Sequence, residues 1–324
     1  MKASKKCAVI IVFSIILLTG GLSIALAQTE YPNRPIEIVV PYNPGGSSDI
    51  AQLAFKDRVA KVLGQPVVPV YKPGAGSAIG AAFVAKSKPD GYTLLVGANS
   101  TIVIAPLTRK DIGYTMDDFI PICTLSTAPM TVCVRYDNPY KTMKDFIEAA
   151  KTKKMKYSTY GTLTVAHICM EALCRAAGFQ AIHIPYSSGS TSLSAVLGGH
   201  VDIGMASGSL GMLGPDKLRI VAVAQKNRYR LFPEVPSWGE IGYPIDGLAT
   251  FAIWAPKNTP KEIVNKIYEA FKKVVEESGK EIAAFLEKTE SDLNFLNPEE
   301  TRKVFEADHE SKKKTLAEMG MLIK

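Results

Sequence analysis

Hydrophobic and polar positions along this chain follow two alternating periods. Short runs rich in β-branched residues, such as 36–40 and 218–223, have the length and composition of buried strands. Between them lie longer segments, such as 165–177, in which apolar residues recur every three or four positions, as in an amphipathic helix. Regular alternation of strand and helix predicts an α/β protein whose sheets are mostly parallel and flanked by helices.

This pattern predicts the following elements. We expect strands at 36–40, 66–71, 92–96, 131–135, 156–158, 182–184, 201–205, 218–223 and 251–254. We expect helices at 49–63, 81–87, 143–151, 165–177, 191–197, 261–277, 280–288 and 298–320. Polar loops are expected where these segments meet.

The first 27 residues have the three parts of a secretory signal. Three early lysines precede the apolar run AVIIVFSIILL, and Ala25-Leu26-Ala27 supplies a small-x-small cleavage site. The alternative is an uncleaved membrane anchor, but Gly20 and Gly21 interrupt the apolar run well before the ~20 residues that a spanning helix needs. We therefore expect export to the periplasm, with cleavage near Ala27.

Length and charge narrow the function classes. Roughly 300 residues follow the leader, more than one hydrophobic core usually serves, so two domains are expected. The formal charge of +7 includes the three leader lysines, and the remaining lysine runs contain no interleaved aromatic residues. This pattern argues against nucleic-acid binding. A mild positive field could still assist the capture of anions.

Four cysteines follow the leader, and their spacing matches no zinc-binding pattern. We interpret Cys123, Cys133, Cys169 and Cys174 as buried thiols, with a Cys123–Cys133 bridge as the alternative. His183 and His200 also lack the paired spacing of metal ligands, and His167 lies among apolar neighbours in a helix. No metal and no cofactor are expected.

The segment joining the first strand to the first helix reads PYNPGGSSD. Such a turn presents backbone N–H groups and hydroxyls at a helix start, where an anion such as a carboxylate is stabilised. Gly45 and Gly46 allow close approach of the backbone, and Ser47 and Ser48 offer hydroxyl groups. The alternative is an ordinary strand–helix turn.

Two further residues of this segment each have two interpretations. Tyr42 either covers a ligand or belongs to the core. Asp49 is an unusual neighbour for an anion, so it orients Ser47, backbone amides or a water, or it binds the amino group of an amino-acid ligand. Elsewhere, Asn99, Ser100 and Ser207 follow expected strands, at the ends where ligands bind in open α/β sheets.

Catalytic motifs are missing from the sequence. It contains no G-x-S-x-G elbow, no H-E-x-x-H and no Walker loop. The Gly-rich stretch at 74–80 has the spacing G-x-G-x-x-x-G, which does not match the dinucleotide fingerprint and favours a tight turn. We expect a binding protein and no enzyme. An exported hydrolase that uses a loop serine is the alternative.

Several motifs together resemble the tripartite tricarboxylate transporter substrate-binding proteins, the Bug or TctC family. They are YPxRPI from Tyr31, PxxPGGxxD from Pro41, KPGAGxxIG from Lys72, KPDGYTL from Lys88, Pro185-Tyr186 and LGGHVD from Leu197. Each motif alone is weak, but their order and spacing are specific, and the resemblance covers nearly the whole chain after the leader.

The resemblance implies a periplasmic, two-lobed Venus flytrap that holds a small carboxylate in the cleft and delivers it to a tripartite tricarboxylate-type permease. In this family the ligand's proximal carboxylate lies between two loops, one from each lobe, partly through ordered water. Here the loops would be 42–49 and 157–164, with the 185–190 loop closing the opposite wall. The implied contacts in the later segments are Tyr160, Gly161, Thr162, Thr164 and Tyr186.

The second loop departs from the family pattern, because Tyr160 and Leu163 replace small residues and predict a narrower or more apolar pocket. None of the three loops contains Arg or Lys, which predicts charge balance by amides and helix dipoles. We expect a monomer with residues 28–128 and 246–324 in one lobe and 129–245 in the other. A sensory protein that presents its ligand to a receptor kinase is a further alternative to transport.

Overall fold

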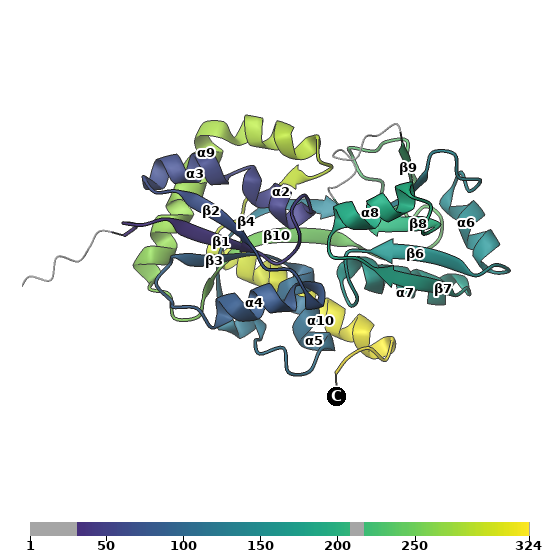
Figure 1. The fold of residues 1–324 in the computed structure, drawn as a ribbon, viewed down its shortest axis with the longest axis horizontal. Helices are drawn as coiled ribbons and strands as arrows, with labels where there is room; N and C mark the ends of the chain where they lie inside the picture. Colours follow the sequence, from purple (N-terminus) through teal and green to yellow (C-terminus); the bar gives the residue numbers. More distant parts are fainter. Residues whose placement is uncertain (1–30, 208–216, 324) are drawn as a thin grey trace, which may run out of the picture. The chain divides into compact units, whose positions relative to one another are not determined.

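The strands of this protein form two sheets, one of six strands and one of five (Figure 1). The structure, a computed structural model, describes residues 31–207 and 217–323, and from Arg34 onward the chain forms one compact unit. The predicted leader lies outside the described residues. In the part that is described, no helix is both long enough and apolar enough to cross a membrane.

The first sheet has the strand order β11-β4-β10-β3-β1-β2. β1 pairs in parallel with β2 and β3, whereas β10 pairs antiparallel with β3 and β4, and β11 antiparallel with β4. Its strands are β1 (Ile36–Val40), β2 (Val67–Tyr71), β3 (Thr93–Ala98), β4 (Phe119–Pro129), β10 (Leu248–Pro256) and β11 (Asp292–Leu293).

The second sheet has the strand order β7-β6-β8-β5-β9. β6 pairs in parallel with β7 and β8, and β5 pairs antiparallel with β8 and β9. Its strands are β5 (Thr131–Arg135), β6 (Met155–Thr159), β7 (Ala181–Pro185), β8 (Ile203–Ala206) and β9 (Leu218–Val223).

The α/β class is confirmed, but both sheets are mixed where mostly parallel sheets were expected. Parallel neighbours need a crossover connection, usually a helix, whereas antiparallel neighbours do not. The chain passes from β4 to β5 through Met130 alone, and these connecting strands run antiparallel to their neighbours. The chain returns to the first sheet between β9 and β10. The lobe boundaries expected near 129 and 246 stay a prediction.

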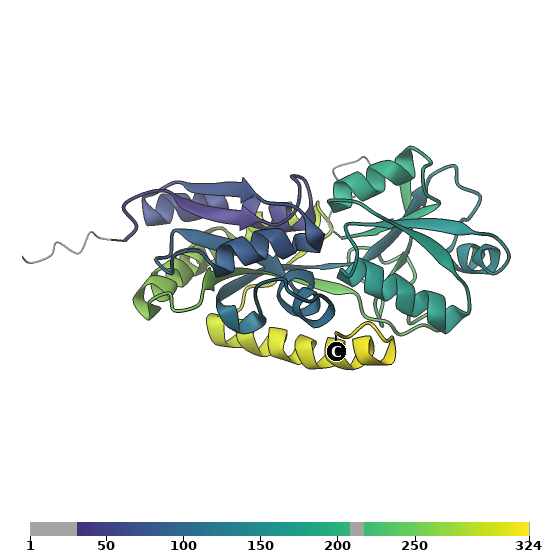
Figure 2. The ribbon, with the colours of Figure 1, turned by 60° about the horizontal axis from the view of Figure 1, so that its bottom comes forward.

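Helices cover both faces of the first sheet (Figures 1 and 2). α2, α3 and α9 lie on one face, and α4, α5 and α10 lie on the other. Their bounds are α2 (Ser47–Leu53), α3 (Lys56–Leu63), α4 (Ala78–Ala85), α5 (Ala105–Thr108), α9 (Lys261–Glu287) and α10 (Pro298–Glu318). Three short helical segments accompany them: η1 (Ala75–Ser77), η2 (Ser100–Ile104) and η3 (Met116–Asp118). The second sheet is flanked by α6 (Met143–Ala150), α7 (Val165–Ala177) and α8 (Gly189–Leu197).

The single helix expected at 49–63 is wrong, because the structure breaks it into α2 and α3 at Ala54 and Phe55. Phe55 is fully buried and packs against Phe271 of α9, with ring centroids 5.8 Å apart. The two helices expected at 261–277 and 280–288 are confirmed as the two parts of α9, which are separated by a kink with non-helical dihedral angles at Ser278.

The C-terminal helix α10 contacts both lobes. It packs beside β4 and η2 of the first, while Arg175 on α7 donates to the carbonyl oxygen of Glu318 at its end, over 2.7 Å. In Figure 2 α10 extends from beneath the first sheet toward the second. The last helix therefore links segments on both sides of the space between the two sheets.

Candidate functional site

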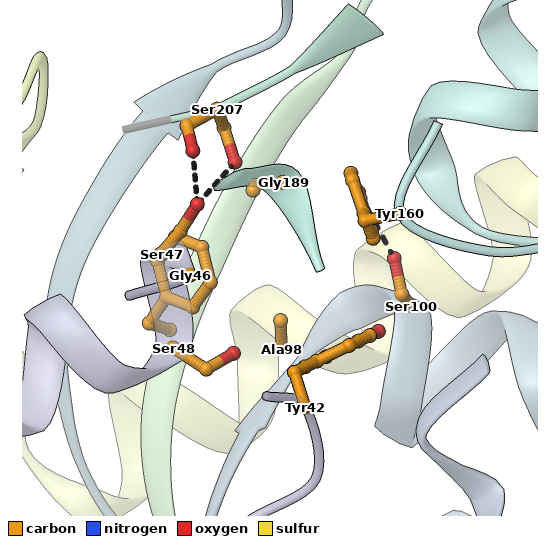
Figure 3. A pocket seen from close by; sticks show the side chains of 11 residues that line it. Tyr42, Gly46, Ser47, Ser48, Ala98, Ser100, Tyr160, Gly189 and Ser207 are labelled. Carbon is orange, nitrogen blue, oxygen red and sulfur yellow. Dashed lines mark hydrogen bonds between the residues drawn. The ribbon is translucent and has the colours of Figure 1, made fainter. Parts of the chain in front are cut away.

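The carboxyl ends of the parallel strands in both sheets meet around one small cavity, which we call the inner cavity (Figure 3). It is formed by segments that follow β1, β3, β6, β7 and β8, together with β10. The carboxyl edge of parallel strands is where open α/β sheets bind ligands. Its lining residues are Tyr42, Gly46, Ser47, Ser48, Ala98, Ser100, Tyr160, Gly189, Ser207, Ala249 and Phe251.

Serine hydroxyls from both sheets supply the polar surface of the inner cavity. Ser47 Oγ donates to the carbonyl oxygen of Ser207 and lies 2.9 Å from its Oγ. Ser100 Oγ accepts the N–H of Val165, the first residue of α7, over 3.0 Å. Among the described residues that line this cavity there is no histidine, cysteine or charged residue. These lining residues therefore offer neutral hydrogen-bonding groups.

Asp49 braces the first loop from behind and does not line the inner cavity. Its Oδ2 accepts the N–H of Gly45 over 2.9 Å, while its Oδ1 accepts from Gln52 Nε2 and from the hydroxyl of Tyr71. The Asp49 side chain is buried. Partial burial of the Tyr71 hydroxyl, together with the neighbouring Asp49 carboxylate, raises the pKa of Tyr71 to about 12. The side chain thus orients a backbone amide, one of the roles predicted for it.

Two tyrosines from opposite lobes form one wall of the inner cavity. The rings of Tyr42 and Tyr160 meet edge to face, with centroids 5.8 Å apart. Burial raises the pKa of both hydroxyls, so both remain protonated and able to donate. The space they help to enclose is about 20 Å³, room for one ordered water. In this conformation the inner cavity has no room for a carboxylate group.

A second and larger space, the outer compartment, lies on the other side of the same two tyrosines. Its volume is about 350 Å³. It is lined by Tyr42, Gly74, Ala75, Gly76, Ser77, Arg109, Tyr160, Gly161, Thr162, Pro185, Tyr186 and Ser187. Thr162 and Ser187 are exposed, so the compartment reaches the surface.

The Gly-rich stretch at 74–77 forms one side of the outer compartment in an uncommon conformation. Gly74, Ala75, Gly76 and Ser77 all have positive φ angles. Positive φ is uncommon for residues with a Cβ and tends to cluster at functional sites. The predicted tight turn is confirmed, and a Cβ on Gly76 would lie 2.6 Å from Arg109 Nη2 and 3.0 Å from the carbonyl oxygen of Thr162.

Of the described residues that line either space, Arg109 alone has a charged side chain. It follows α5, outside the three loops considered from the sequence, and its Nη2 donates to the carbonyl oxygen of Thr162 in the opposite lobe. The expectation that amides and helix dipoles alone supply the positive charge is thus incomplete. The run Leu107–Asp111 (LTRKD) resembles a solvated charge cluster, and only the tertiary fold brings Arg109 to the site.

The second loop is braced by two stacked histidines. Leu163, at a φ of 55°, donates its N–H to Nδ1 of His167 over 3.1 Å. The His167 ring stacks on that of His183, with centroids 4.1 Å apart, and Nε2 of His183 lies 2.8 Å from the hydroxyl of Thr159. Burial lowers the pKa of both rings, that of His183 to about 3, so both are neutral near pH 7.

Thr164 supports the second loop without lining either space. It is the N-cap of α7, accepting from the N–H of His167 and donating to the carbonyl oxygen of Gly161 over 2.8 Å. Asn99 is directed elsewhere. It donates to the carbonyl oxygen of Leu248 over 2.9 Å and lines a separate cavity of about 220 Å³ with Asp246, Asp308 and Lys312.

The structure sorts the predicted ligand residues into three groups. Seven of them surround the inner cavity: Tyr42, Gly46, Ser47, Ser48, Ser100, Tyr160 and Ser207. Three others line only the outer compartment: Gly161, Thr162 and Tyr186. Four line neither: Gly45, Asp49, Asn99 and Thr164. The roles of all of them as ligand contacts stay predictions.

Ala98, Ala249 and Phe251 of the inner cavity were missed, because none has a polar side chain: Phe251 begins an expected apolar strand, and Ala98 and Ala249 lie just outside expected strands. The four cysteines among the described residues are free and buried, so the alternative Cys123–Cys133 bridge does not form. Within residues 31–207 and 217–323, no group of three or more His, Cys, Asp or Glu side chains could hold a metal ion.

Comparison with known proteins places the chain in a family. The model of the tripartite tricarboxylate transporter family receptor matches residues 51–321. The UPF0065 protein in the gbd 5' region of Cupriavidus necator is 36% identical over 79% of this chain and 80% of its own length.

Two solved structures extend the match to the fold. The periplasmic binding protein BugD is 26% identical, covers 91% of this chain and 100% of its own, and has a TM-score of 0.84. A TctC solute-binding protein from Polaromonas, solved with no ligand, is 31% identical over 89% of this chain and 99% of its own, with a TM-score of 0.62. This chain therefore belongs to the tripartite tricarboxylate transporter receptor family, a family of solute-binding proteins and not of enzymes.

Proposed function

We propose that this protein captures a small organic carboxylate between its two lobes in the periplasm and delivers it to a tripartite tricarboxylate-type permease. The observation that carries the proposal is the inner cavity, in which uncharged donors from both sheets converge. A carboxylate held by several such donors is stabilised without a counter-ion, because hydrogen bonds to a charged group are stronger than neutral ones. The family to which the chain belongs supports the same class of ligand.

Closure of the lobes would be part of capture, since groups from both are needed. Hydrogen bonds already cross the space between the sheets, among them those of Ser47 with Ser207, Ser100 with Val165, and Arg109 with Thr162. Two relatives of similar identity, 26% and 31%, match this structure with TM-scores of 0.84 and 0.62. A rigid-body rotation of lobes would produce such a difference.

Binding should be tested with the protein lacking its leader and a panel of succinate, malate, citrate, benzoate and glutamate, each beside its amide analogue. A ligand that binds only the folded state raises the melting temperature. We expect at least one acid to do so and its amide not to. No shift with any acid, in folded protein freed of carried-over ligand, would contradict the proposal.

The serine hydroxyls give the sharper test. Ser47→Ala should weaken binding of the best acid by roughly tenfold or more, because a hydrogen bond to a charged group contributes ~1.5–3 kcal/mol. Ser194→Ala is the matched control, since this exposed serine on α8 donates only to the carbonyl oxygen of Ser190. Equal affinities for the two variants would exclude Ser47 from the site.

Delivery is tested separately, by uptake of the radiolabelled acid into cells that lack the gene. We expect uptake to fall and to return when the gene is restored. Normal uptake together with a lost transcriptional response to the same acid would favour the sensory alternative.

A further inference from the structure

We propose that the outer compartment is a second anion subsite, in which Arg109 binds the distal acidic group of a dicarboxylate whose first carboxylate lies in the inner cavity. The inference rests on the proposed function and narrows its ligand to acids with two negative charges. Three observations carry it: the position of the guanidinium, its unused donors, and the buried hydroxyls beside it.

The charge in this compartment has no counter-ion. In the part of the chain that the structure describes, no carboxylate lies within ion-pair distance of Arg109, and no Asp or Glu is among the residues lining the compartment. Its one hydrogen bond is to the carbonyl oxygen of Thr162, while its Nε is buried and has no partner among the described residues. A guanidinium has five N–H donors in a planar fork that matches a carboxylate, so most of its capacity is available.

Two buried hydroxyls beside Arg109 are also free to donate. Tyr42 is 7% exposed and Ser77 is fully buried, and neither hydroxyl makes a hydrogen bond of ordinary geometry with any described residue. Ser77 lies close enough to Tyr42 to lower the tyrosine pKa, against the larger opposite effect of burial. Leaving buried polar groups unpaired costs free energy, about 1–3 kcal/mol each. An anion accepting from these hydroxyls would remove that cost.

The two spaces are arranged for one ligand. They share Tyr42 and Tyr160, so a chain of methylene groups passing along these rings would join a carboxylate in the inner cavity to one beside Arg109. At about 20 Å³ the inner cavity has room for a single water in this conformation, so any part of a ligand beyond one acidic group has to lie in the outer compartment. Arg109 also donates across to the opposite lobe, so a bound distal carboxylate would be held where the lobes close.

The test measures dissociation constants by calorimetry for unbranched dicarboxylates from succinate to suberate and for monocarboxylates of equal carbon number. The wild-type protein should bind its best dicarboxylate at least tenfold more tightly than the matched monocarboxylate. In Arg109→Gln this preference should disappear. The affinity for the dicarboxylate should fall tenfold or more, and the affinity for the monocarboxylate should fall less than threefold. Arg109→Lys should recover part of it, because the charge remains but the planar fork does not.

Lys110→Gln is the matched control, because it removes the same charge from an exposed neighbouring residue and should leave the preference intact. Ser77→Ala supplies a second variant, expected to weaken the dicarboxylate severalfold while leaving the melting temperature of the ligand-free protein unchanged or higher. If Arg109→Gln weakened the binding of both acids equally, the subsite would be overturned, and the role of Arg109 would be limited to its contact with the opposite lobe. A wild-type preference for monocarboxylates would overturn it as well. If the wild type bound neither acid, the proposed function itself would fail.

Discussion

The inner cavity and the outer compartment share two tyrosines but differ in what surrounds them. The inner cavity is lined by hydroxyls of Ser47 and Ser100 that already bond across the lobes, and none of its described lining residues is charged. The outer compartment contains Arg109, the buried hydroxyl of Ser77, which has no partner among the described residues, and a loop with four successive positive φ angles, while the equally unpartnered hydroxyl of Tyr42 belongs to both spaces. Polar groups that are already hydrogen-bonded hold a rigid shape, whereas buried polar groups without partners gain hydrogen bonds when a ligand binds. We therefore assign common anchoring to the inner cavity and ligand selection to the outer compartment.

The largest effect is expected from filling the inner cavity. Ala98→Leu adds three carbon atoms to a residue that lines a space of about 20 Å³ (Figure 3). It should reduce binding of every carboxylate at least a hundredfold, because no acidic group could then enter. Overpacking is expected to cost ~1–3 kcal/mol of stability as well, so binding is measured by calorimetry at a temperature where the variant is folded.

Ala307→Leu is the control for this substitution, since Ala307 lies on the exposed face of α10. It should change neither binding nor stability appreciably. Unchanged affinity in Ala98→Leu would mean that the ligand does not enter the inner cavity, and the assignment of anchoring would have to be abandoned.

The difference between the two spaces also explains what could be predicted from the sequence. α7 and β9 have the bounds that hydrophobic periodicity predicted. For α7 the local sequence sets both ends, because Thr164 caps its start and Gly178 ends it in a left-handed conformation. The inner cavity was largely predicted, since its serines and glycines follow strands and form recognisable loop motifs. Local chemistry carries that information.

The outer compartment could not be predicted in the same way. Arg109 reaches it only because α5 and the 74–77 turn pack together beneath the opposite lobe, as the contact of Gly76 with Arg109 shows. β4 was missed for a similar reason. It contains prolines at 121 and 129 and is held by antiparallel pairing with β10, more than a hundred residues away. Neither packing nor pairing at such separation leaves a local pattern.

An intermediate effect is expected at Gly76, with Gly64 as its matched control. Both have left-handed φ angles, +58° and +70°, so alanine at either position should cost about 1 kcal/mol of stability. Only at Gly76 would the new Cβ meet neighbours, namely Arg109 and the carbonyl oxygen of Thr162, whereas nothing lies within 4 Å at Gly64.

Gly76→Ala should therefore weaken dicarboxylate binding about tenfold, by displacing the guanidinium, and Gly64→Ala should leave it unchanged. Denaturant titration gives the stabilities and calorimetry the affinities. Equal affinities in the two variants would show that the outer compartment tolerates displacement of Arg109 and contributes little to selection.

The smallest expected effect is on the pH dependence of stability. It arises because Asp49 supports the first loop, whereas His167 and His183 support the second. Burial, and for His183 the neighbouring His167, depresses the pKa of these rings below that of the unfolded chain. Glu171 opposes this shift at His167, its carboxylate lying 3.9 Å from Nε2, and Arg109 reinforces it. Between about pH 6.5 and 3 the unfolded chain then binds more protons, so the stability of the folded state falls as the pH drops through this range and is fully present above it.

We expect the melting temperature to fall by a few degrees more between pH 7.5 and 5 in the wild type than in His183→Gln, which has no ring to protonate. His200→Gln, at an exposed histidine, should behave as the wild type does. Because protonation of His167 at Nδ1 removes the acceptor for the N–H of Leu163, the loss should centre on the second loop. Relative to the intrinsic exchange rate at each pH, the protection of the Leu163 amide should therefore fall on acidification more than that of Gly45, whose N–H is bonded to Asp49. An equal loss of protection in both loops would show that the histidine pair is not what distinguishes them.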